Sequence, residues 1–261
     1  MAYQKVPVPS ELYHLTKAEH LSGILEDGKI RRFGDTECWF CESLSKMKAY
    51  MEQTVMCEGK PYYAVGGQLC RYPKFVPEDY ILLKLKPLHS EERWYRWEQE
   101  LPHNSPKALI RAAKEFSALK VGYRGDLDFR NAEIINVSLF LTDGIVQSES
   151  VQTAPELEDI LFERIDQEQR DYTDSLCRMT QGQLIANAEE IAANHFCYNE
   201  IHTIRLSRED MLLLLSTDEP LAYLTGAWME EHSVGSSDEF VHATVCLCEE
   251  LRQREQPEVT M

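Results

Sequence analysis

Hydrophobic and polar positions follow two different rhythms along this chain. Up to about residue 141, short apolar runs typical of strands alternate with stretches in which apolar residues recur at helical spacing. Beyond residue 156 only the helical spacing continues. In the first part, the pattern predicts strands over residues 11–16, 37–42, 61–70, 79–86, 119–123 and 132–141, and helices over residues 17–27, 43–56, 105–118 and around Trp94 and Trp97.

The change of rhythm also predicts where the chain divides. Residues 147–155 are polar and have no period, which is typical of a linker. We therefore expect an α+β domain over residues 1–147 and an all-α domain over residues 156–256. The apolar spacing predicts helices in the second domain over residues 157–165, 184–198, 208–215, 220–231 and 238–254.

The first strand and helix form a clearly signalled unit. The strand carries His14 and ends at Thr16, which can cap the following helix, with Glu19 as its capping-box partner three residues later. Gly28 stands where a left-handed residue would end that helix. This arrangement can deliver His14 to a cleft. A lone histidine is, however, more often part of a packed core or of the surface.

Composition narrows the class of protein. The 261 residues are 43% hydrophobic and 10% aromatic, which is enough for packed cores. No apolar run approaches the roughly 20 residues that cross a bilayer, and the first residues have no apolar leader core. We expect a cytoplasmic protein without membrane association, whose eight cysteines are reduced.

The pair Cys38 and Cys41 has the spacing of many metal ligands. It falls on the strand predicted over residues 37–42, and residues three apart on a strand face opposite sides. The four converging ligands of a zinc site are therefore not expected here. Buried free thiols are the simpler interpretation of these cysteines.

Charge is distributed unevenly. The whole net charge of −17 lies in residues 148–261, which contain seven arginines, no lysine and 24 acidic residues. Such asymmetry supports the division into two domains. It disfavours DNA binding by the second domain, because like charges repel. The acidic surface either serves solubility alone or attracts a basic protein partner.

Polar residues at three places of the first domain are candidates for chemistry. Glu133 opens an apolar strand, so it faces a cleft or pairs with Arg124 or Arg130 at the surface. Ser43 stands where a strand becomes a helix, which a simple cap also explains. Residues 93–97 combine aromatic and basic side chains, which would suit base stacking or an amphipathic helix packed on the core.

Together these segments resemble the ADP-ribosyltransferase fold, and most nearly the DarT-like enzymes. The resemblance covers residues 10–145 and implies a split sheet with helices and the use of NAD. The second domain loosely resembles helical domains of unknown function in bacterial mobile elements. The motifs that carry the first resemblance are Tyr13-His14-Leu15-Thr16, the helix Leu21-Ser22-Gly23-Ile24-Leu25-Glu26-Asp27-Gly28, the Phe40-to-Ser43 junction and Ala132-Glu133.

The resemblance also implies roles for individual residues. His14 would contact a ribose of NAD, and Glu133 would stabilise the positive charge that develops on the ribose as nicotinamide leaves. Arg31 or Arg32 would contact phosphate or the transition state. The residues placed beside the dinucleotide are Thr16, Phe40, Ser43, Tyr62 and Tyr63, among which Phe40, Tyr62 or Tyr63 would stack on nicotinamide.

Two hypotheses of function follow. In the first, the protein is an NAD-dependent ADP-ribosyltransferase of a phage or mobile element, and its acceptor is an unidentified nucleic acid or protein. In the second, it is a non-catalytic acidic binding protein on a degenerate transferase scaffold, for example a nucleic-acid mimic that inhibits a host defence nuclease.

Overall fold

The chain divides into two compact units, Met1–Thr153 and Ala154–Met261. The computed structural model describes residues 2–32, 36–63, 68–88, 93–98, 106–143, 146–231 and 237–255. The boundary lies after Thr153 because residues 148–152, predicted as part of a linker, form the edge strand β12 of the first unit. Its outer side chains face solvent, so this strand carries little of the apolar signal that marks inner strands.

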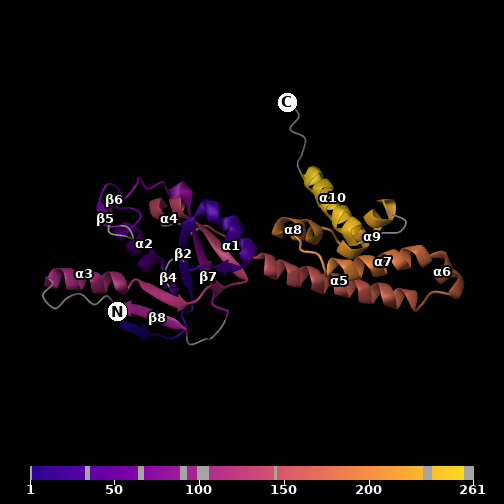
Figure 1. Ribbon diagram of the computed structural model, residues 1–261, viewed down its shortest axis with the longest axis horizontal. Helices are drawn as coiled ribbons and strands as arrows, with labels where there is room; N and C mark the ends of the chain where they lie inside the picture. Colours follow the sequence, from indigo (N-terminus) through magenta and orange to yellow (C-terminus); the bar gives the residue numbers. More distant parts are fainter. Residues whose placement is uncertain are drawn as a thin grey trace, which may run out of the picture. The chain divides into compact units, whose positions relative to one another are not determined.

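The first unit is built on an antiparallel sheet of eight strands in the order β1-β8-β9-β4-β2-β7-β11-β12 (Figure 1). Two short pairs, β3 with β10 and β5 with β6, lie outside it. The strands are β1 (Ala2–Lys5), β2 (Leu12–Lys17), β3 (Lys29–Ile30), β4 (Glu37–Cys41), β5 (Pro61–Tyr63), β6 (Leu69–Arg71), β7 (Tyr80–Leu85), β8 (Trp94–Glu98), β9 (Lys120–Arg124), β10 (Leu127–Asp128), β11 (Asn131–Asn136) and β12 (Ser148–Gln152).

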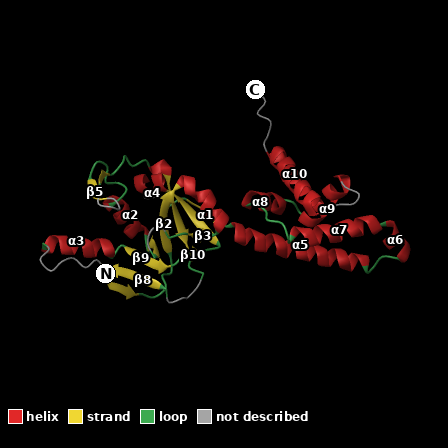
Figure 2. Cartoon of the chain, viewed as in Figure 1, coloured by secondary structure: helices red, strands yellow, loops and turns green. Residues whose placement is uncertain are grey.

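Helices cover both faces of this sheet, and each face has its own core (Figure 2). Leu12, Leu83 and Leu85 point to one face, where they pack with Leu25. Leu82 and Ile135 point to the other, with the methionines of the helix after β4. The helical segments of this unit are η1 (Ala18–His20), α1 (Leu21–Asp27), α2 (Leu44–Gln53), η2 (Pro77–Asp79), α3 (Lys107–Ser117) and α4 (Val137–Asp143).

The sequence signals that predict helix ends are confirmed at Gly28 and Ser43 and wrong at Thr16. Gly28 ends α1 with φ 63°, in the left-handed region. Ser43 caps α2 by accepting a hydrogen bond from the backbone N–H of Lys46 at 3.2 Å. Thr16, predicted as a cap, lies inside β2, which runs on to Lys17, and neither η1 nor α1 has a side-chain cap. Pairing with β7 extends the strand past the local signal.

Three further segments differ from the pattern. Residues 61–70, predicted as one strand, contribute to the two paired strands β5 and β6. Residues 94–98 are strand β8, because they pair with β1 and β9, where a helix was predicted. Trp94 is fully buried there, and the Arg124 guanidinium lies 4.3 Å from the ring centroid of Tyr95. Burial of Trp94 removes it as a base-stacking surface. The strand predicted over 132–141 ends at Asn136, whose side chain accepts from the N–H of Leu139 as α4 begins.

The described residues of the second unit form helices around one hydrophobic core. The helices predicted over 208–215, 220–231 and 238–254 are confirmed near their expected places. The helix predicted over 157–165 continues to Leu176, and the one predicted over 184–198 is divided at Asn187 into two helices. Ser207 caps α8 as its position before an acidic first turn indicated. The helices are α5 (Ala154–Leu176), α6 (Gln181–Ala186), α7 (Ala188–Ile201), α8 (Arg208–Ser216), α9 (Pro220–Glu231) and α10 (Ser237–Glu255).

Candidate functional site

The large sheet opens between β2 and β4. These strands are joined by one residue pair, Tyr13 with Cys41, and they separate beyond it. The imidazole of His14 enters the opening, with Nδ1 3.4 Å from the carbonyl oxygen of Trp39. A side chain here takes the carbonyl that a strand amide would take in a continuous ladder.

The opening fixes the state of His14. A carbonyl oxygen can only accept, so Nδ1 carries the proton of this bond and Nε2 is left as an acceptor in the neutral ring. Burial lowers the pKa of His14, and the Trp39 carbonyl opposes that shift only in part. His14 is therefore a neutral hydrogen-bond acceptor with a fixed tautomer at neutral pH.

A hollow of about 190 Å³ lies at this opening, and we call it the split hollow. It is smaller than the roughly 300–1,000 Å³ of typical small-molecule sites, so a larger ligand would extend beyond it. The rings of His14 and Phe40 stand 5.5 Å apart at one wall. Its lining is mostly aromatic or basic and includes Tyr13, His14, Arg31, Arg32, Trp39, Phe40, Tyr50 and Lys120.

The cations of the split hollow come from two places, the loop after β3 and the start of β9. Arg31 pairs with Asp27 at 2.8 Å, and Arg32 pairs with Asp126 at 3.5 Å. Lys120 lies over aromatic rings at the start of β9. The lining thus brings together His14, Phe40, Arg31 and Arg32, four of the residues predicted from the sequence.

Glu37 is the carboxylate of the split hollow. Its side chain is 1% exposed, and it accepts hydrogen bonds from the Thr36 hydroxyl at 2.6 Å and from Arg124 Nε at 3.3 Å. Sequence analysis did not single out Glu37. The signal that could have found it is an acidic residue at the first position of an otherwise apolar strand.

Glu133 lies elsewhere in the first unit. In the paired strands, Glu133 is opposite Lys84, which is opposite Tyr13, so these three side chains share one face of the sheet. His14 follows Tyr13 and therefore points to the other face. The structure does not bring His14 and Glu133 together.

The surroundings of Glu133 are polar and partly open. Its carboxylate accepts hydrogen bonds from Lys84 Nζ and from the Ser148 hydroxyl, both at 3.1 Å. The bond from Lys84 holds the pKa of Glu133 below its usual value. Glu11 also pairs with Lys84, at 3.3 Å. A hollow of about 360 Å³ beside Glu133 is lined by Lys84, Lys86 and Arg130.

The remaining predicted residues are spread over the first unit. Thr16 lies on β2 opposite Ile81, outside the lining of the split hollow. The Ser43 hydroxyl is the cap of α2. Tyr62 belongs to the β5–β6 hairpin, where its ring lies 4.5 Å from that of Tyr72. The side chain of Tyr63 is outside the described residues.

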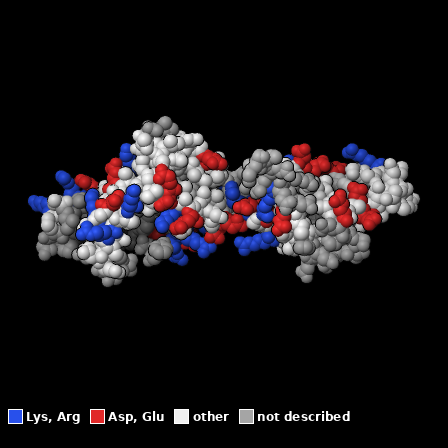
Figure 3. All heavy atoms as spheres, turned by 90° about the horizontal axis from the view of Figure 1, so that it is seen from above, with Lys and Arg blue, Asp and Glu red and all other residues white. Residues whose placement is uncertain are grey.

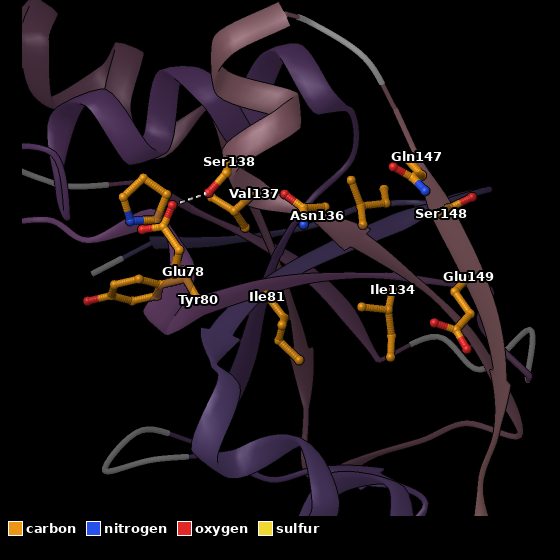
Figure 4. Close-up of a pocket in the computed structure, with 12 residues that line it drawn as sticks. Glu78, Tyr80, Ile81, Ile134, Asn136, Val137, Ser138, Gln147, Ser148 and Glu149 are labelled. Carbon is orange, nitrogen blue, oxygen red and sulfur yellow. Dashed lines mark hydrogen bonds between the residues drawn. The ribbon is translucent and has the colours of Figure 1, made fainter. Parts of the chain in front are cut away.

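A cavity of about 400 Å³ lies where β11 turns into α4. Glu78 and Glu149 stand at opposite ends of it, and the Ser138 hydroxyl donates to Glu78 at 2.8 Å (Figure 4). Its lining residues include no Lys, Arg or His, so it lacks the cations that favour phosphate. Asn136, a residue type that favours helix N-caps, is the signal from which this turn could have been predicted.

The reactivity of the cysteine thiols also bears on function. Cys38 and Cys41 are free and face opposite sides of β4, and burial raises their pKa to about 11 and about 12. Such thiols are inert as nucleophiles.

Over the described ranges, none of the helices has both the length and the apolar composition needed to cross a bilayer.

The second unit offers a charged surface in place of a polar hollow. Acidic and basic side chains are visible over both units, and the acidic excess of the second unit follows from its sequence (Figure 3). A groove of about 290 Å³ between α8 and α10 is lined by Glu209, Leu212, Leu213 and Arg252. Arg252 is ion-paired with Asp210.

No known protein family, curated protein or solved structure matches this chain.

Proposed function

We propose that the first unit is an ADP-ribosyltransferase-like unit that binds NAD at the split hollow. The observation that carries the proposal is the fixed state of His14 in the opened sheet. Its Nδ1 is engaged by the Trp39 carbonyl, so its Nε2 is an acceptor suited to a ribose hydroxyl. The resemblance of residues 13–16 to the DarT-like motif points to the same contact.

The lining of the split hollow supports a nucleotide in particular. Arg31, Arg32 and Lys120 favour an anionic phosphate, and the partly exposed Trp39 offers apolar surface to a nicotinamide ring. Phe40, which was predicted to stack on nicotinamide, is only 2% exposed and offers little surface for stacking. The volume of about 190 Å³ fits one half of the dinucleotide, and the other half would extend along the surface. NAD would supply the ADP-ribosyl group of the reaction, with nicotinamide as the leaving group.

The position of Glu133 bears differently on NAD binding and on ADP-ribosyl transfer. A carboxylate stabilises the developing charge on a ribose only when it lies beside that ribose. Glu133 points to the face opposite His14 and is engaged with Lys84 and Ser148. This geometry supports NAD binding more strongly than transfer by Glu133.

Calorimetric titration of the full chain with NAD tests the binding proposal. We expect His14→Ala to weaken binding at least tenfold, because it removes the ribose acceptor. His20→Ala is the matched control, since its side chain is 62% exposed and outside the split hollow. Equal affinity of the wild type and His14→Ala, or no binding of NAD by the wild type, would reject the proposal.

A labelling assay tests the transfer of ADP-ribose. Labelled NAD is incubated with the full chain and with DNA, RNA or protein acceptors, and the label retained by each acceptor is compared between the wild type and Glu133→Ala. Loss of labelling in Glu133→Ala would assign the transfer step to Glu133. Equal labelling by both proteins would remove Glu133 from the reaction while leaving NAD binding intact.

The charge of the second unit favours one other function, binding of a basic protein. Residues 148–261 carry −17 with no lysine, and Leu212, Val241 and Val245 are exposed apolar side chains beside this charge. A basic partner would associate through long-range attraction, which salt screens. Binding of the full chain to a basic protein that persists unchanged from low to high salt would contradict this function.

A further inference from the structure

Lys120 occupies an unusual place at the split hollow. It is the first residue of β9 and lies opposite Cys41 of β4, next to the single pair that joins β4 to β2. Its backbone therefore belongs to the sheet, while its side chain lines the hollow with Tyr50 and Trp39. Position on a strand fixes this side chain more closely than a loop would.

Three aromatic rings surround the ammonium of Lys120. Its Nζ lies 4.9 Å from the ring centroid of Phe116, 5.3 Å from that of Tyr50 and 5.4 Å from that of Trp39. All three distances are within the range of cation–π attraction. Ring faces restrain a lysine without transferring its proton, so the rings place a formal positive charge at the wall of the hollow.

The positive charge of Lys120 acts on the neighbouring thiol of Cys41. Burial raises the pKa of Cys41 to about 12, and the Lys120 ammonium opposes the rise by favouring the thiolate. Lys120 is also half-buried, whereas the side chains of Arg31 and Arg32 are 68% and 52% exposed. A partly buried cation is screened less by water and salt than an exposed one.

We propose that Lys120 binds the phosphate of the nucleotide in the split hollow and makes the hollow selective for nucleotides over nucleosides. This inference rests on the proposed function. An ammonium acts on phosphate as a point charge with three donors, so it needs no bidentate geometry. The three rings hold it at the wall before the ligand arrives, which lowers the entropy lost on binding.

The test compares two ligands that differ by one phosphate. Nicotinamide riboside and nicotinamide mononucleotide are titrated into the full-length wild type and into Lys120→Met, which keeps an unbranched apolar side chain among the rings. We expect the wild type to bind the mononucleotide at least tenfold more tightly than the riboside. In Lys120→Met this preference falls to less than threefold, while riboside affinity stays within twofold of the wild type.

Two controls separate charge from structure. Lys120→Arg retains the cation and keeps a preference for the mononucleotide. Lys107→Met removes an exposed lysine at the start of α3 and leaves both affinities unchanged. A thermal unfolding curve of each variant confirms that it is folded.

Each contrary outcome has its own meaning. Equal affinities of the wild type for the two ligands, or an unchanged preference in Lys120→Met, overturn the inference and leave the proposed function standing. A similar loss of both affinities in Lys120→Met shows a structural role for Lys120 and also overturns it. If the wild type binds neither NAD nor either of these two ligands, the proposed function is overturned and this inference with it.

Discussion

The two units hold carboxylates of low exposure, the buried Glu37 and the half-buried Glu168, in different ways. In the first unit, Glu37 is 1% exposed and is opposed by the guanidinium of Arg124. In the second, Glu168 of α5 accepts hydrogen bonds from the backbone N–H groups of Leu221 and Ala222, at 2.9 and 3.2 Å. One carboxylate is held by a counter-ion and the other by the first turn of α9.

Composition explains the difference. The first unit has nearly equal numbers of acidic and basic residues, whereas residues 148–261 have seven arginines for 24 acidic residues. A chain segment so short of cations can satisfy a buried carboxylate with helix N-terminal amides, which are available at every helix start. The second unit therefore holds Glu168 Oε2 with two backbone amides, while Oε1 of the same carboxylate is buried without a hydrogen-bond partner among the described residues.

Loss of the counter-ion should give the largest effect. Arg124→Met leaves the Glu37 carboxylate buried with the Thr36 hydroxyl but without its guanidinium. Breaking a buried ion pair on one side typically costs about 3–5 kcal/mol, and we expect about 3 kcal/mol because Arg124 is itself half-exposed. Urea denaturation of the full chain measures the loss. Glu37→Gln combined with Arg124→Met should recover part of it, and no recovery would contradict the ion-pair explanation.

The amide-held carboxylate should cost less to remove. Glu168→Ala deletes the acceptor for the Leu221 and Ala222 amides, which is equivalent to losing a helix cap, at about 1–2 kcal/mol. Glu168→Gln retains a carbonyl acceptor and should lie within about 0.5 kcal/mol of the wild type. The buried Trp228 of α9 reports this unfolding by fluorescence. A Gln variant as unstable as the Ala variant would show that the charge itself is needed.

The same two variants give a pH test. Burial raises the pKa of Glu168, despite the amides that lower it. A raised folded-state pKa means that the stabilising contribution is present below the unfolded pKa and is lost as pH rises through the folded one. Between pH 7 and pH 4.5, the wild type should therefore gain free energy of unfolding relative to Glu168→Gln. Parallel pH profiles would contradict this.

His14 should give the opposite pH dependence in the first unit. Its pKa is lowered by burial, so its contribution is present above the unfolded value near 6.5 and is lost as pH falls. From pH 7.5 to pH 5, the wild type should lose on the order of 1 kcal/mol relative to His14→Gln. His20→Gln, an exposed control, should follow the wild type. A wild type that stays level with His14→Gln would show that His14 is not buried in the neutral form.

Sequence reasoning succeeded where the deciding forces are local. The positive φ of Gly28, the caps at Ser43 and Ser207 and the helical spacing of the second unit depend on a few adjacent residues. Their physical causes can be read within one turn of helix. The bounds of α8, α9 and α10 were predicted closely for the same reason, whereas α5 runs to Leu176, well past its predicted end at residue 165.

Sequence reasoning failed where distant pairing decides. Residues 94–98 become a strand because β1 and β9 flank them, and residues 148–152 become one because β11 offers its edge. The candidate site shows the same limit. His14 was identified as a cleft residue, but its contact with Trp39 and its separation from Glu133 depend on the registers of β2, β4, β7 and β11.

The smallest effect is expected at Glu133, where the first unit uses a counter-ion in the open. Lys84→Met removes the cation shared by Glu11 and Glu133, whose side chains are 42% and 38% exposed. Water solvates both carboxylates once the ammonium is gone, so the free energy of unfolding should fall by about 0–1 kcal/mol. High salt should reduce even this difference, because exposed pairs are screened. A loss near that of Arg124→Met, measured in the same urea titration, would mean that the Glu133 network is as buried as the Glu37 pair, and the contrast between counter-ions inside and outside the sheet would fail.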